Sequence, residues 1–138
     1  MEKFKFLEHT ADIKFQAFGK DIEEAFENAA LTLKKAICEE TEILEKEEEK
    51  IEVEGKDFES LLYNFLEEFL FLVDGENFLL SKIKNLEIDK KNFKLNAIVS
   101  GDKANNYEFT NKVKAVTYNE MFVRQERGKW VVQVVLDV

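Results

Sequence analysis

The chain has 138 residues, 45% of them hydrophobic, and its 29 acidic and 20 basic side chains leave a formal net charge of −9. This length predicts a single domain over residues 1–138, and thirteen Phe side chains are enough to build one core. A surface this acidic repels phosphate backbones, so direct binding of nucleic acid is not expected. Hard cations and basic protein surfaces are the partners that it attracts.

Two strands are expected at the beginning of the chain, over residues 3–7 and 12–18. Apolar and polar residues alternate in the second of them, which is typical of a strand with one buried face. The segment between the two strands, His9-Thr10-Ala11-Asp12, is a short polar turn by composition.

Two helices are expected next, each preceded by a carboxylate in the capping position. Asp21, with Glu24 three residues later, has the form of a capping box before an apolar helical face that extends to Ile37. Asp57 takes the same place before an apolar stripe over residues 58–73. That stripe is too broad for a surface helix, so we expect the second helix to pack against a sheet.

An acid-rich run separates the two predicted helices. Residues 39–49 are dense in Glu and predict a solvated linker or a frayed helix end, followed by a short strand at 51–53. Cys38, just before this run, is the only cysteine, which excludes an intramolecular disulfide. Its place in the apolar helical pattern predicts a buried side chain.

The last part of the chain is richer in predicted strands. Strands are expected near 81–89 and 92–100, and again at 121–126 and 130–137, where a turn at Arg127-Gly128-Lys129 predicts a closing hairpin. Residues 109–119 fit both helical spacing and strand alternation, and we favour the helix.

This order of elements predicts an α+β fold, a two-layer sandwich of a mixed or antiparallel sheet with two or three helices. The five glycines stand apart from one another, and regular βαβ alternation is missing. Both observations exclude a doubly wound nucleotide-binding fold.

Motifs for independent catalysis or membrane insertion are not found. Nucleophilic triads and zinc sites depend on histidine, and His9 is the only one; P-loop, HExxH and EF-hand patterns are also missing. An enzyme is therefore not expected. The first residues lack a signal-peptide core, and the longest apolar stretch, residues 65–73, is broken by Glu67 and Glu68, so we expect a cytosolic protein without a membrane segment.

Two polar features are candidates for a binding site. Asp12 lies in a polar cluster between two apolar strand patterns, although the cluster taken alone favours a simple turn whose Asp and Thr side chains satisfy backbone N–H groups. At the other end, Asp137 and the carboxylate of Val138 are adjacent acidic groups, although a frayed terminus needs no function.

The sequence resembles the archease family, small accessory proteins associated with RNA ligation. Similar blocks occur in the same order from residue 4 to the last residue, at 9–13 (HTADI), 61–68 (LLYNFLEE), 112–118 (KVKAVTY) and 130–138 (ending VVLDV). Two residues depart from the pattern of many archeases: Lys14 stands where Gly is common, and Asn119 where His is common.

The resemblance implies a metal site formed by Asp12, Asp137 and Val138. His9 either orients Asp12 or only caps the turn, and Lys114 is either a contact to a partner or an ordinary exposed lysine. Two carboxylates about 4 Å apart repel by roughly 4 kcal/mol at an effective dielectric near 20, so a bound cation would hold such a group together. Oxygen ligands favour hard ions, Ca²⁺ first and Mn²⁺ or Mg²⁺ as alternatives. This hypothesis requires the two ends of the chain to meet.

The resemblance also implies a function. Archeases stimulate RtcB-type RNA ligases in tRNA splicing by promoting guanylylation of the ligase and its multiple turnover. A chaperone-like action on a tRNA cytosine-5 methyltransferase is a second hypothesis, and a stand-alone metal-dependent hydrolase is a third.

Overall fold

A computed structural model describes residues 2–8 and 11–138. The elements occur in the order β1 (Phe4–Leu7), β2 (Ile13–Gly19), α1 (Ile22–Cys38), β3 (Glu47–Glu54), α2 (Phe58–Glu76), β4 (Phe78–Asp89), β5 (Lys94–Lys103), a short 3-10 helix (Ala104–Asn106), β6 (Ala115–Glu126) and β7 (Lys129–Asp137). The predicted α+β class is confirmed.

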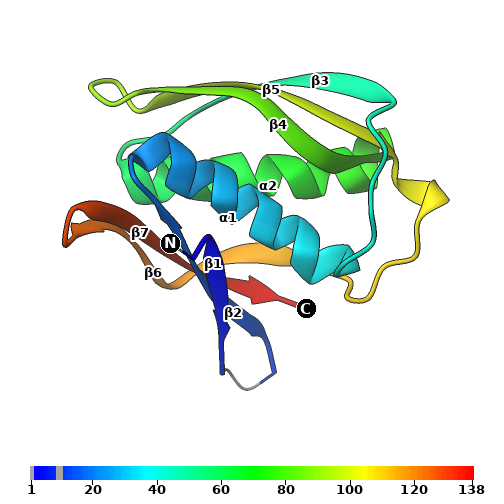
Figure 1. The fold of residues 1–138 in the computed structure, drawn as a ribbon, viewed down its shortest axis with the longest axis horizontal. Coiled ribbons are helices and arrows are strands. Elements are labelled where there is room, and N and C mark those ends of the chain that lie inside the picture. Colours follow the sequence, from blue (N-terminus) through cyan, green and yellow to red (C-terminus); the bar gives the residue numbers. More distant parts are fainter. Residues whose placement is uncertain (1, 9–10) are drawn as a thin grey trace.

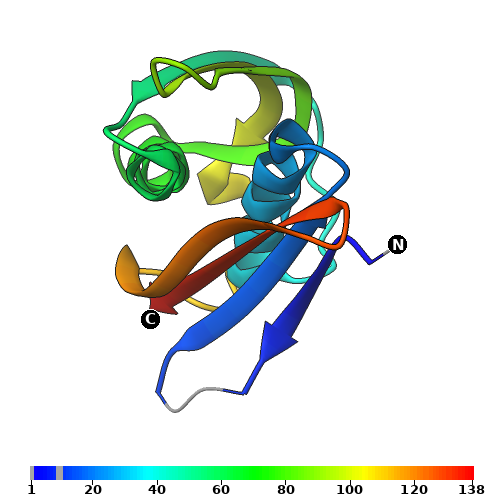
Figure 2. The same cartoon turned by 90° about the vertical axis from the view of Figure 1, so that its left-hand side faces the viewer.

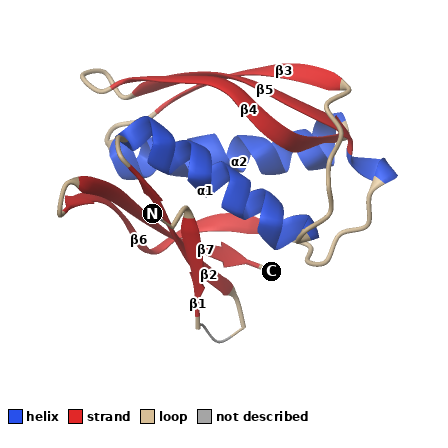
Figure 3. Cartoon of the chain, viewed as in Figure 1, coloured by secondary structure: helices blue, strands red, loops and turns tan. Residues whose placement is uncertain are grey.

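Two antiparallel sheets enclose the two helices (Figures 1 and 3). One sheet has the strand order β1-β2-β7-β6 and the other β3-β5-β4, and every strand pair is antiparallel. We predicted one sheet in a two-layer sandwich, and the structure has a second sheet on the other side of the helices. Phe65, Phe69 and Leu70 of α2 are buried together with Leu61, Leu62 and Leu66, and an apolar surface that wide needs cover on two sides.

Both helices begin at the predicted carboxylates. Asp21 accepts a hydrogen bond from the Glu24 N–H (2.8 Å), and the Glu24 carboxylate accepts one from the Lys20 N–H (2.8 Å). Asp57 accepts from the Ser60 N–H (2.7 Å), while the Ser60 hydroxyl accepts from the Asp57 N–H (3.1 Å). These bonds satisfy backbone donors that the first helical turn leaves without partners.

The segment 109–119 does not form the helix that we favoured. Residues 107–114 form a loop, and from Ala115 the chain enters β6, which pairs with β7. The apolar residues of this segment do not share one buried face, because Val113 is buried whereas Phe109 is 38% exposed. The N–H groups of Thr110 and Asn111 both donate to the Ile37 carbonyl (2.7 and 3.2 Å), so this loop caps the end of α1.

The acid-rich run was only partly predicted. Residues 39–46 do connect α1 to the next element, but residues 47–49 belong to β3, whose Glu47 pairs with Gly101 of β5. Strand β3 is an edge strand, where charged side chains are well tolerated. Lysines of β4 and β5 face it, with Lys84 at 2.7 Å from Glu48 and Lys103 at 3.1 Å from Glu47.

Two smaller predictions concern Cys38 and membranes. The Cys38 side chain is buried, as predicted, and its burial raises the pKa of the thiol. Among the described residues, no helix combines the length and the apolar character that crossing a membrane requires.

Candidate functional site

Strands β2 and β7 lie side by side and bring distant parts of the chain together. In their antiparallel register Ile13 pairs with Leu136, so the next positions along the same register are Asp12 and Asp137. Both views show the end of β7 close to the beginning of β2 (Figures 1 and 2). The meeting of the two segments that carry the candidate carboxylates, which the metal hypothesis requires, is therefore observed.

Strand β6 adds a third chain segment at this end of the sheet, where β2 begins and β7 ends. Ala115 pairs with Asp137, and the Lys114 N–H donates to the Asp137 carbonyl (2.7 Å). Four of the five predicted site residues, Asp12, Lys114, Asp137 and Val138, thus come from adjoining ends of β2, β6 and β7. The fifth, His9, lies outside the described residues.

The surroundings of the two carboxylates differ. Asp137 is exposed, and because Leu136 is fully buried in the core, strand alternation directs Asp137 to the opposite face of the sheet. Asp12 is half-buried beside a depression of about 470 Å³. Val138 is half-buried, and its side chain packs against the core.

The depression beside Asp12 lies between the β1–β2 hairpin and the end of α1. Apolar side chains form part of it, and charged ones surround them: Phe6, Leu7, Ile13 and Ala36, with Lys35, Glu39 and Glu40. Lys35 forms an ion pair with Glu40. Asp12 is thus adjacent to open space that could hold water or a group from a partner.

Strand β6 contains a bulge near this end of the sheet that no pattern in the sequence indicates. Thr117 pairs with Val135 and Phe122 with Gln133, so the four residues 118–121 lie opposite the single residue Val134. Glu120, in this bulge, has a left-handed φ of 55°. Its carboxylate forms an ion pair with the Lys14 ammonium at 2.9 Å. Lys14 was noted as a departure from the family pattern, but no signal in the sequence connected it to Glu120.

The donor set fits a hard cation. Asp12, Asp137 and the Val138 carboxylate supply only oxygen atoms, and three protein ligands leave positions for water or for an oxygen of a partner. Within residues 2–8 and 11–138, no cluster of three or more His, Cys, Asp or Glu side chains could hold a metal.

Comparison with known proteins identifies the family. The sequence model of the archease protein family (MTH1598/TM1083) matches residues 4–138. The archease of Pyrococcus furiosus is 41% identical over 143 residues, and that of Sulfurisphaera tokodaii 37% identical over 140 residues; in both cases the similarity covers 100% of each chain.

Two solved structures have the same fold. The solution structure of Protein 1598 of Methanobacterium thermoautotrophicum has a TM-score of 0.85 and 37% identity, with 100% of each chain covered. The crystal structure of a Thermotoga maritima protein described as an archease, possible chaperone, has a TM-score of 0.65 and 21% identity, and 97% of this chain and 96% of that one are covered. The family model, the full-length relatives and the fold agree, and the chain belongs to the archease family.

Proposed function

We propose that this protein activates an RtcB-type RNA ligase and does so with a divalent cation held by Asp12, Asp137 and the Val138 carboxylate. The pairing of Ile13 with Leu136 carries this proposal, because it makes the two aspartates neighbours although 124 positions separate them in the sequence. Gathered carboxylates repel one another unless a cation neutralises them.

Each residue of the proposed site has a distinct task. The two aspartates bind the cation, and the packing of the Val138 side chain against the core keeps the end of the chain beside them. Lys114, exposed in the loop just before β6, offers a positive charge to a phosphate or a carboxylate of the ligase. When bound, the cation supplies a positive centre that can accept oxygen ligands from the partner.

The net charge favours action on a protein rather than on RNA. With a formal charge of −9, the molecule repels an RNA backbone but attracts the basic surface that an RNA-binding enzyme needs. The ligase would bind the RNA, and this protein would act on the ligase.

A guanylylation assay tests the proposal. The cognate ligase is incubated with labelled GTP and a divalent cation, with and without this protein, and the covalent ligase–guanylate is quantified. We expect faster guanylylation and more RNA joined per ligase molecule. Equal rates with and without the protein at saturating concentration would refute the proposal.

A second candidate function is a chaperone-like action on a tRNA cytosine-5 methyltransferase. The description of the Thermotoga maritima relative as a possible chaperone favours this class of activity. Affinity capture with quantitative mass spectrometry separates the two candidates, because the principal partner is a ligase in one case and a methyltransferase in the other.

A further inference from the structure

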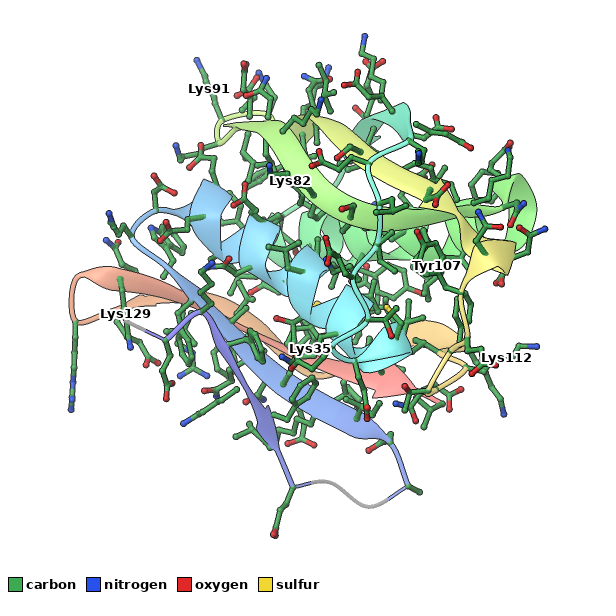
Figure 4. The ribbon with its side chains drawn as sticks, turned by 45° about the vertical axis from the view of Figure 1, so that its right-hand side comes forward. Lys35, Lys82, Lys91, Tyr107, Lys112 and Lys129 are labelled. Atoms are coloured by element: carbon green, nitrogen blue, oxygen red, sulfur yellow. The ribbon has the colours of Figure 1, made fainter. Side chains whose placement is uncertain are left out.

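Helix α2 differs from the rest of the molecule in its charge. Its 19 residues include five acidic side chains, Glu59, Glu67, Glu68, Asp74 and Glu76, and no Lys or Arg. The lysines lie on other elements: Lys35, Lys82 and Lys91 project from α1, β4 and the β4–β5 turn (Figure 4). Among the described residues, no ion pair includes a residue of α2. The carboxylates of this helix therefore lack a close basic partner among the described residues, although Lys112 lines the same pocket as Asp74.

Exposed aromatic rings accompany this charge. Phe71 of α2 is 55% exposed and Tyr118 of the β6 bulge is 54% exposed. Tyr118 stacks on Tyr63 with ring centroids 4.3 Å apart and an interplanar angle of 7°. Tyr63, Glu67 and Phe71 follow one another at intervals of four residues, which places them in one row along the helix. Figure 2 shows α2 end-on at the border of the molecule.

A groove of about 440 Å³ lies beside this row. It is lined by Val53, Glu54, Asn64, Glu67, Glu68 and Phe71. Of its three carboxylates, Glu54 lies 4.0 Å from the Lys94 ammonium, and Glu67 and Glu68 form no ion pair among the described residues. Two hydrogen bonds hold the residues that line the groove in position. The Val116 N–H donates to the Glu67 carboxylate (2.7 Å), and the Asn64 amide donates to the Glu54 carbonyl (2.8 Å).

This combination has a matching ligand chemistry. An arginine guanidinium is planar, stacks on aromatic faces and forms paired hydrogen bonds with carboxylates. Charged side chains are enough to keep a surface helix soluble in water. The exposed rings of Phe71 and Tyr118 add apolar surface in contact with water, which is unfavourable unless a partner covers it. A second copy of this chain, or a nucleic acid, would bring further negative charge to the groove and be repelled.

We propose that the surface formed by Glu54, Tyr63, Glu67, Glu68, Phe71 and Tyr118, the α2 face, docks an arginine-bearing basic surface of a partner protein. The identity of that partner as the RNA ligase rests on the proposed function, whereas the chemistry of the face does not. Strand β6 links the face to the candidate metal site: Val116, whose N–H donates to Glu67, pairs with Leu136, the residue before Asp137.

Two matched charge reversals and one aromatic variant test the docking face on the immobilised ligase. Glu68→Lys changes a half-buried groove carboxylate, and Glu87→Lys makes the same charge change at an exposed position of β4 that does not line the groove. Phe71→Ser removes the exposed ring. We expect Glu68→Lys and Phe71→Ser to weaken ligase binding about tenfold and Glu87→Lys less than twofold, with circular dichroism unchanged. Equal affinity of all variants and the wild type would overturn the inference.

A second probe separates this inference from the proposed function. Backbone amide NMR spectra of the isotope-labelled protein are recorded with the peptide (Arg-Gly)₆ and with (Asp-Gly)₆. We expect the arginine peptide alone to shift amide signals of residues 63–71 and 118. If it does so while the ligase neither binds nor responds, the docking face stands and the ligase proposal falls. Shifts spread evenly over the glutamates of β3 and of α2, or no shifts, would overturn the docking face.

Discussion

Replacing Asp137 by Asn is expected to affect stability in opposite directions with and without a divalent cation. Asp12 comes just before β2, and extending the Ile13–Leu136 register by one position places it opposite Asp137. Opposite residues of antiparallel strands have Cβ atoms about 5 Å apart, and we take roughly 6 Å for the separation of the two carboxylates. Because Asp137 is exposed, an effective dielectric of about 60–80 applies, and the repulsion amounts to about 0.7–0.9 kcal/mol. In EDTA the variant should therefore unfold about 2–4 °C higher than the wild type.

A saturating cation should reverse this order. At a concentration 100 times its Kd, an ion that binds only the folded protein adds about 2.7 kcal/mol, or about 10 °C in Tm for a domain of this size. The wild type should gain this increment and Asp137→Asn should lose most of it. The Asp12→Asn variant should show the same two effects. In EDTA the Tm of the double variant should exceed that of either single variant only slightly, because one substitution already removes the repulsion.

Differential scanning fluorimetry in EDTA and in Ca²⁺, Mn²⁺ or Mg²⁺ measures both effects. Glu108→Gln, which removes one negative charge from an exposed side chain of the loop before β6, is the control. It should leave the cation effect unchanged. A cation-induced rise in Tm that is as large in Asp137→Asn as in the wild type would refute the reasoning, as would a wild type that no divalent cation stabilises.

Three further substitutions test the fold. Asp57→Ala removes the acceptor of the Ser60 N–H bond (2.7 Å) and should lower the free energy of unfolding by about 1 kcal/mol, measured by urea denaturation. Leu136→Ala leaves a cavity at a fully buried site and should cost about 3 kcal/mol in the same assay; a cost below 1 kcal/mol would contradict the described core. Burial, and then the charge of Glu24, raise the pKa of Glu27 above 4.5, so its ionised form is disfavoured in the folded state. The stability that Glu27 contributes when protonated is lost as the pH rises through this raised pKa, and Glu27→Gln should therefore raise Tm more at pH 7 than at pH 4.

The helices and the terminal strands were predictable because local signals specify them. Asp21 and Asp57 each combine a capping carboxylate with an apolar face of helical period, and the structure begins both helices there. The alternation of residues 12–18 similarly identifies β2. These signals act within a few residues, so they need no information about the remainder of the chain.

The missed features depend on partners that are distant in sequence. Strand β6 forms because β7 supplies its hydrogen-bond ladder, and the glutamates of β3 join a sheet because β5 lies beside them. Likewise, the Lys14–Glu120 ion pair joins positions 106 residues apart. The neighbourhood of Asp12 and Asp137 was anticipated only through the resemblance to archeases, since spacing alone does not determine which strands pair.

Residues 114–118, which span the beginning of β6, contact both the candidate metal site and the α2 face. Alternate residues of β6 and of the position just before it contact different parts of the molecule: the N–H of Lys114 donates to Asp137, the N–H of Val116 donates to Glu67, and Tyr118 stacks on Tyr63. Because each contact is made in the isolated protein, neither surface has to be ordered when a partner binds, and little conformational entropy is lost. The partners that we propose for the acidic groups of the two surfaces nevertheless differ, a cation in one case and a guanidinium in the other. Binding of the cation and docking of the partner should therefore be separable by substitution, although both rely on the same strand.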